Sequence, residues 1–222
     1  RPEAWALAAA LFGYVIGNRG FAQFSLVREL PLFPAEAALL VCAATTLLRM
    51  ALRQTTAVRR DSLNYAIIAW IVLGTVRLWP DLRANGVLAL RDFATIYYAL
   101  FFFVAQALAS HAPSARLLRK TWLVASAVLP FTYFLFTHFD AFFLQTLVVR
   151  GVPLFFYKDD LVAAYLFAGF LTFMTMTDWP VRLRVGLAAA SYASAFTINS
   201  SRAAIVGLLL ASGWWVVARR WA

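Results

Sequence analysis

Apolar runs separated by short, mostly basic connections make up most of this sequence. Eight runs can be distinguished, at about Trp5–Ile16, Pro34–Leu48, Leu63–Val76, Ala94–Ala109, Thr121–Phe136, Leu161–Met176, Val185–Ile198 and Ala203–Val217. A backbone that faces lipid must satisfy its hydrogen bonds internally, so each run is predicted to be an α-helix. Several runs are shorter than the ~20 residues of a straight spanning helix. We expect flanking Tyr, Trp and Arg residues to lengthen them.

The solvent of these helices follows from the composition. The chain has 222 residues, is 63% hydrophobic and has a mean hydropathy of +0.75, whereas soluble domains are usually about 45–50% apolar. A water-facing surface built from this sequence would expose large apolar patches. The sequence therefore predicts an all-α fold, a polytopic transmembrane helix bundle of about eight spans. We find no internal repeat and no low-complexity linker, which predicts a single transmembrane domain over residues 1–222.

The basic residues set the predicted orientation. The net charge is +10, but the arginines are spread through the connections, where they act as topology signals, so no nucleic-acid partner is expected. Twelve Lys and Arg residues fall on one side of the predicted membrane and eight on the other. The richer side should be cytoplasmic. The eight residues on the outer side are Arg19, Arg28, Arg77, Arg83, Arg91, Arg150, Lys158 and Arg202.

Four predicted helices begin on the outer side, and basic residues stand at three of their starts. Arg91, Lys158 and Arg202 each lie beside Asp, Ser or Asn residues that favour helix N-caps. A helix N-terminus attracts anions, so the three cations are predicted to form an anion site together. The alternative is that these cations are snorkelling membrane anchors, with the neighbouring aspartates as caps or ion-pair partners.

The longest outer connection is Thr137–Tyr157, and it is too apolar for a free loop. We interpret it as a helix or re-entrant segment in the membrane interface, ended by Arg150 and Gly151-Val152-Pro153. Such a segment either walls a groove for a lipid chain or simply covers helix ends. The sequence contains no metal-binding motif and no glycine loop for phosphates, so neither a metal nor a cofactor is expected.

Three polar segments stand out between the apolar runs. They are Asn18-Arg19-Gly20-Phe21-Ala22 leading through Phe33-Pro34 to Ala35-Glu36, Arg91-Asp92 followed by Tyr97-Tyr98, and Ser200-Ser201-Arg202-Ala203-Ala204. Together they resemble the O-antigen ligase and polymerase superfamily of bacterial membrane proteins. Family members often carry Gly-Glu where this chain has Ala35-Glu36. They are also longer, with a periplasmic loop that holds a catalytic histidine, so we expect this chain to be the N-terminal part of a larger protein.

The resemblance implies a membrane glycosyltransferase in the bacterial inner membrane with a periplasmic active face. Such an enzyme moves a glycan from undecaprenyl pyrophosphate to a hydroxyl of lipid A core or of another glycan. Arginines suit the leaving pyrophosphate because they are always charged and bind phosphate bidentately. The motif match assigns Arg202 to catalysis. By their position on the outer side, Arg91 is predicted to join it in catalysis, and Lys158, Arg150 and Arg19 are predicted to bind substrate. The general base would be the loop histidine, beyond Ala222.

Two other functions remain open from the sequence. A transporter or flippase of a lipid-linked or anionic substrate would use the outer arginines as half of an alternating-access site. It should show paired repeats and broken helices, and we find no repeat. The third hypothesis is a non-catalytic membrane subunit that holds a lipid-linked substrate for a partner.

Overall fold

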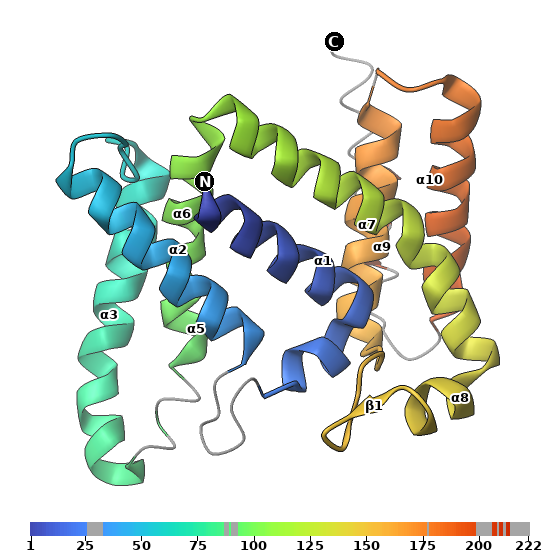
Figure 1. Cartoon of the computed structure of the whole chain (residues 1–222), viewed down its shortest axis with the longest axis horizontal. Coiled ribbons are helices and arrows are strands. Elements are labelled where there is room, and N and C mark those ends of the chain that lie inside the picture. The colour runs from blue at the N-terminus through green and yellow to red at the C-terminus, as the bar shows by residue number, and fades with distance from the viewer. Residues whose placement is uncertain are drawn as a thin grey trace. The chain divides into compact units, whose positions relative to one another are not determined.

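The chain is mostly helical. A computed structural model describes residues 1–25, 33–86, 89, 93–176, 178–198, 206–207, 209–210 and 212–213 (Figure 1). Its helices are α1 (Pro2–Gln23), α2 (Pro34–Ala51), α3 (Ser62–Asn85), α5 (Ala94–Tyr97), α6 (Leu100–Ala109), α7 (Ala112–His138), α8 (Asp140–Gln145), α9 (Asp159–Thr175) and α10 (Val181–Phe196). Within those ranges the strands are β1 (Val148–Val149) and β2 (Val152–Pro153), which form one short hairpin. The predicted all-α class is confirmed.

The helices follow the apolar runs of the sequence. Each run between Trp5 and Ile198 coincides with a helix, and the run Ala94–Ala109 is divided between α5 and α6. The last run, Ala203–Val217, falls mostly outside the described residues. In the described ranges, α2, α3 and α7 are long and apolar enough to cross a membrane. These three helices are compatible with membrane insertion.

Helix α7 begins earlier than predicted. It starts at Ala112, before the predicted start at Thr121, so Arg116, Arg119 and Lys120 lie in the helix and not in a loop. Arg and Lys are good helix formers, which allows the helix to continue through them. His111 caps this start, because its Nδ1 accepts a hydrogen bond from the Ser114 N–H at 3.3 Å.

The outer connection is not one continuous helix. After α7 ends at His138, the chain forms the short helix α8 and then the β1–β2 hairpin. Val149 pairs with Val152, and the two residues between them, Arg150 and Gly151, have φ values of 53° and 80°. Positive φ at both central residues is what a type I′ hairpin turn requires. Arg150 therefore lies at the tip of a hairpin, where we expected a helix end.

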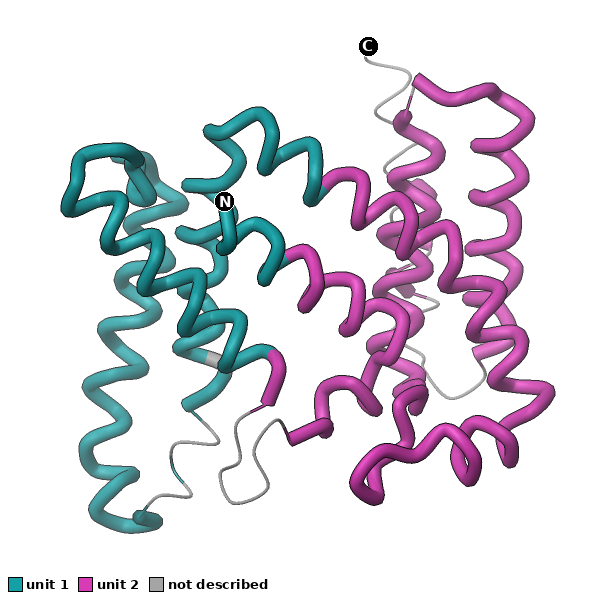
Figure 2. Tube along the Cα trace, viewed as in Figure 1, with its two compact units in different colours: residues 1–7, 35–118 teal, residues 8–34, 119–222 magenta. Residues whose placement is uncertain are grey.

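The chain divides into two compact units, which Figure 2 colours separately. Unit 1 comprises Arg1–Leu7 and Ala35–Leu118, and unit 2 comprises Ala8–Pro34 and Arg119–Ala222. In unit 1, one core cluster joins Ala4, Cys42, Val104 and Leu108. Beside it lies a buried ion pair, with Arg49 Nε 2.8 Å from Glu3 Oε1. The two are close enough to attract strongly, although they lack the alignment of a hydrogen bond.

Unit 2 has its own core. Its largest cluster includes Val15, Leu129, Tyr157, Val162 and Ile198, so it joins α1, α7, α9 and the residues that follow α10. Helices α9 and α10 pack against each other along their length (Figure 1). The single transmembrane domain over residues 1–222 stays a prediction.

Candidate functional site

Helix α1 is interrupted at Asn18. The backbone there has φ 51° and ψ −126°, a conformation that favours glycine. The Asn18 side chain is 1% exposed. Its Oδ1 accepts hydrogen bonds from the backbone N–H of Lys158 at 3.0 Å and of Arg19 at 2.9 Å. The interruption thus joins the end of α1 to the residues that lead into α9.

Backbone contacts extend this junction on both sides. The Gly20 N–H donates to Phe156 O at 3.2 Å, and the Phe156 N–H donates to Gly17 O at 3.4 Å. A Cβ atom on Gly20 would lie 2.3 Å from Pro153 O, which is closer than atoms can approach. A Cβ atom on Gly17 would lie 3.0 Å from Leu154 O. The two glycines therefore allow the close approach of α1 to the end of the hairpin at residues 153–154.

Tyr157 stabilises the same junction through its hydroxyl group. It is 5% exposed, and its hydroxyl donates to Ile16 O at 2.7 Å and lies 3.0 Å from Thr132 Oγ1. Burial raises the pKa of Tyr157 to about 12, so the phenol stays neutral at physiological pH. Its ring packs edge-on against Tyr133 and Phe136. These contacts make Tyr157 a structural residue of the junction.

We call residues 17–25 together with residues 148–160 the basic corner of unit 2. It brings together three residues that were predicted to bind substrate. The Arg19 guanidinium lies 5.5 Å from the centre of the Phe156 ring. Arg150 Nη1 donates to Ser25 O at 3.2 Å, and its guanidinium lies 5.9 Å from the centre of the Phe24 ring. Lys158 stands directly before α9.

The charge of Lys158 is largely balanced within the corner. Lys158 Nζ lies 2.9 Å from Asp160 Oδ2, and each side chain is 51% exposed. Asp159 is also in the first turn of α9, so two acidic residues accompany Lys158 at this helix start. The other two basic residues of the corner, Arg19 and Arg150, are both exposed.

The two residues predicted to be catalytic, Arg91 and Arg202, lie outside the described residues. The chain leading to Arg202 is described as far as Ile198, which is 2% exposed. Ile198 belongs to the same core cluster as Tyr157 and Val162. The last described residue before Asn199 is therefore packed beneath the basic corner.

Sequence reasoning missed a second polar cluster, in unit 1. The hydroxyl groups of Tyr97 and Tyr98 both donate to Glu36 Oε1, at 2.9 Å and 2.6 Å. The other carboxylate oxygen, Oε2, is buried and has no hydrogen-bond partner among the described residues. The sequence contains only an indirect signal. Ala35-Glu36 and Tyr97-Tyr98 were both noted among the polar segments, but nothing in the sequence indicates that these two segments are in contact.

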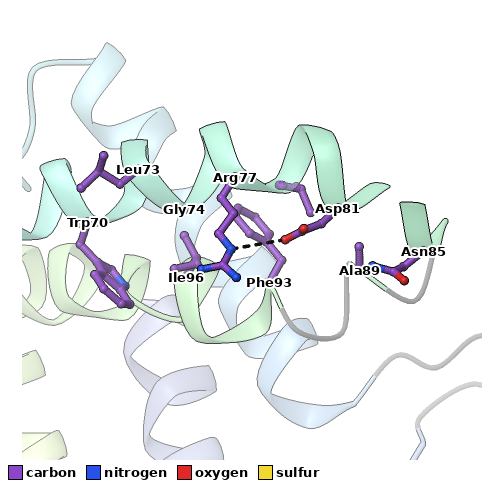
Figure 3. Close-up of a pocket in the computed structure, with 10 residues that line it drawn as sticks. Trp70, Leu73, Gly74, Arg77, Asp81, Asn85, Ala89, Phe93 and Ile96 are labelled. Atoms are coloured by element: carbon purple, nitrogen blue, oxygen red, sulfur yellow. Dashed lines mark ion pairs between the residues drawn. The ribbon is translucent and has the colours of Figure 1, made fainter. Parts of the chain in front are cut away.

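Unit 1 also contains a pocket of about 560 Å³ between α3 and α5. Figure 3 shows Arg77 and Asp81 on its α3 wall, and Phe93 and Ile96 facing them. Neither this pocket nor the apolar ones beside α2 and α10 is lined by Arg19, Arg150 or Lys158. Over the described part of the chain, no three His, Cys, Asp or Glu side chains gather as they would around a metal ion.

Comparison with known proteins gives no relative. No protein-family model, no curated protein and no solved structure matches this chain.

Proposed function

We propose that this chain belongs to a membrane glycosyltransferase of the O-antigen ligase or polymerase type. In this proposal about eight helices span the bacterial inner membrane, and the basic corner faces the periplasm. The donor is a glycan on undecaprenyl pyrophosphate, and the acceptor is a hydroxyl of lipid A core or of another glycan.

The observation that supports this proposal is the position of Arg19 and Arg150 on two segments of unit 2 that are hydrogen-bonded to each other. They come from segments 131 positions apart in the sequence, and both guanidinium groups are exposed. Breaking the glycosyl bond places negative charge on the departing pyrophosphate. Cations fixed in advance stabilise that charge without reorganising during the reaction. Here the hydrogen bonds of Asn18 and the hairpin turn fix the backbone from which the two arginine side chains extend.

Arg202 completes the proposed site. It follows Ile198 by four residues, and four residues of extended chain reach at most about 14 Å. Ile198 packs with Tyr157, directly before Lys158. An arginine within that reach of the basic corner would give the pyrophosphate a third guanidinium.

The transporter hypothesis finds one point of support, the interruption of α1. Transporters commonly build substrate sites from helices broken near the membrane midplane. In α1 the interruption lies near the C-terminal end, at Asn18, and both sides of it are hydrogen-bonded to residues 156 and 158. A locked break at a helix end suits a fixed binding site better than a moving one.

The test compares glycan transfer by membranes that contain the complete protein or a variant of it. Arg202→Ala should abolish transfer at normal protein levels, and Arg202→Lys should rescue it poorly because a point charge lacks the guanidinium fork. Arg19→Ala should reduce transfer, while Arg53→Ala, predicted on the cytoplasmic side, should not. Full activity of both Arg202→Ala and Arg19→Ala would exclude this mechanism.

A further inference from the structure

We propose that the pocket between α3 and α5 binds a zwitterionic phospholipid with a primary ammonium group, of the phosphatidylethanolamine class. The described residues that line the pocket include one guanidinium, of Arg77, and one carboxylate, of Asp81. The rest of its lining is mainly apolar and includes Trp70, Leu73 and Ile96, with Asn85 at one end (Figure 3). This site lies in unit 1 and is separate from the basic corner.

The surroundings of Arg77 call for a polar ligand. Only 6% of the most apolar window of α3 is buried within the protein, so this helix would face lipid along most of its length. Arg77 directly follows the apolar run Leu63–Val76 of this helix, so it lies at the predicted outer boundary of the membrane. Its side chain is 84% exposed. A guanidinium at that boundary extends toward the lipid headgroups, which supply polar partners.

Among the described residues, Arg77 has one loosely placed partner. Arg77 Nε lies 3.7 Å from Asp81 Oδ2, one helical turn away. This distance exceeds that of a hydrogen bond. A guanidinium has five N–H donors and a carboxylate has two acceptor oxygens. Both groups therefore keep hydrogen-bonding capacity that a headgroup can use.

The charges select among headgroups. A purely anionic headgroup would pair with Arg77 but would be repelled by Asp81. A phosphate that is linked to a primary ammonium pairs with both, the phosphate with the guanidinium and the ammonium with the carboxylate. A quaternary ammonium has no N–H to donate. The site therefore fits phosphatidylethanolamine better than phosphatidylcholine or phosphatidylglycerol.

The apolar part of the pocket accommodates an acyl chain. The lining extends from Trp70 to Asn85 along α3, which is about 22 Å at the helical rise. Within this length α5 closes tightly on the helix at Gly74, where a Cβ atom would lie 2.5 Å from the Ile96 side chain. The volume of about 560 Å³ is in the range of sites for small ligands.

The experiment measures retention of defined lipids by the purified full chain, using native mass spectrometry from detergent. Phosphatidylethanolamine should be retained about tenfold better than phosphatidylcholine or phosphatidylglycerol. Phosphatidylcholine has no N–H to donate to Asp81, and phosphatidylglycerol has no cation to pair with it, so each lacks one charge-assisted hydrogen bond. Glycerophosphoethanolamine, which has the headgroup without acyl chains, should bind weakly. Strong binding of that probe would assign the site to a soluble phosphate compound and overturn the proposal.

Variants on α3 give the matched controls. Asp81→Asn should remove the preference over phosphatidylcholine, and Arg77→Ala should lower retention of all three lipids. Arg83→Ala should change nothing, because Arg83 is on the same helix but stacks on Trp79, at 4.9 Å from the ring centre. If Arg77→Ala fails to fold, Asp81→Asn alone decides. Equal retention of the three lipids, or an unchanged preference in Asp81→Asn, would refute the proposal.

Discussion

Substitution of Asn18 separates two opposing contributions to stability at the α1 junction. Asn18 provides the acceptor for the Lys158 N–H, and it also holds a backbone conformation with φ 51° and ψ −126°. Leaving a buried N–H without an acceptor costs about 1–3 kcal/mol. A residue held in such a sparsely populated backbone region costs a further ~1–3 kcal/mol. Asn18 therefore stabilises the fold by accepting the hydrogen bond and destabilises it by holding the strained backbone conformation.

Asn18→Ala and Asn18→Gly both remove the acceptor but differ in strain. Alanine keeps the strained backbone, so Asn18→Ala should lose the whole of the hydrogen-bond contribution. Glycine relieves the strain but adds about 0.5–1 kcal/mol of conformational entropy to the unfolded chain. We therefore expect the glycine variant to be more stable than the alanine variant by about 1 kcal/mol. For a chain of this length, that difference corresponds to roughly 2–4 °C in Tm.

The assay is the apparent Tm of each variant in one detergent at one scan rate, followed by tryptophan fluorescence. Gln23→Ala is the control, because Gln23 lies in the same helix and is exposed. Hydrogen exchange provides a second readout, since the Lys158 amide should exchange faster in both Asn18 variants than in the wild type. An alanine variant at least as stable as the glycine variant would refute the strain argument. Unchanged exchange at Lys158 would refute the hydrogen bond.

Two further predictions concern unit 1. Arg49→Ala should destabilise the protein by about 3–5 kcal/mol, because it leaves the Glu3 carboxylate, which is 1% exposed, without its partner. Thermal unfolding measures this loss, and Arg60→Ala, at an exposed position, should show no comparable loss. Asp61 caps α3, and its hydrogen bonds from Asn64 hold the pKa of its carboxyl below the usual value. Its stabilisation is therefore present above about pH 4 and lost as the pH falls through the lowered pKa, so the Tm difference between wild type and Asp61→Ala should shrink in acid. A difference that grows below pH 4 would contradict this assignment.

The helices were predictable from local sequence. Lipid-facing backbone leaves few alternatives to helix, and start signals were read correctly at Pro34, where α2 begins, and at Lys158, which precedes α9. The exact boundaries of the helices were harder to predict. α7 continues backwards through three basic residues, because charge marks a membrane boundary and does not stop a helix.

The candidate site was predictable only in part, because its contacts are long-range. Arg19, Arg150 and Lys158 were chosen for their charge and their predicted side of the membrane. These criteria do not indicate which segments of the chain lie next to one another. The Lys158 N–H meets a side chain 140 residues away in sequence, and no local pattern specifies that pairing. One local signal was overlooked: Arg150-Gly151 between valines is a two-residue hairpin turn, since glycine readily adopts positive φ.

The segment Gly17-Asn18-Arg19-Gly20 performs two separable tasks. Its glycines and Asn18 build the junction: they allow the backbones to approach and they cap the Lys158 N–H. The Arg19 side chain takes no part in this, because it is exposed and its guanidinium lies 5.5 Å from the centre of the Phe156 ring. The folding requirement alone would preserve the glycines and the asparagine in a protein that had lost any activity. It would not preserve Arg19. Substitution of Arg19 therefore tests the proposed function without disturbing the junction, whereas substitution of Gly17, Asn18 or Gly20 tests the fold.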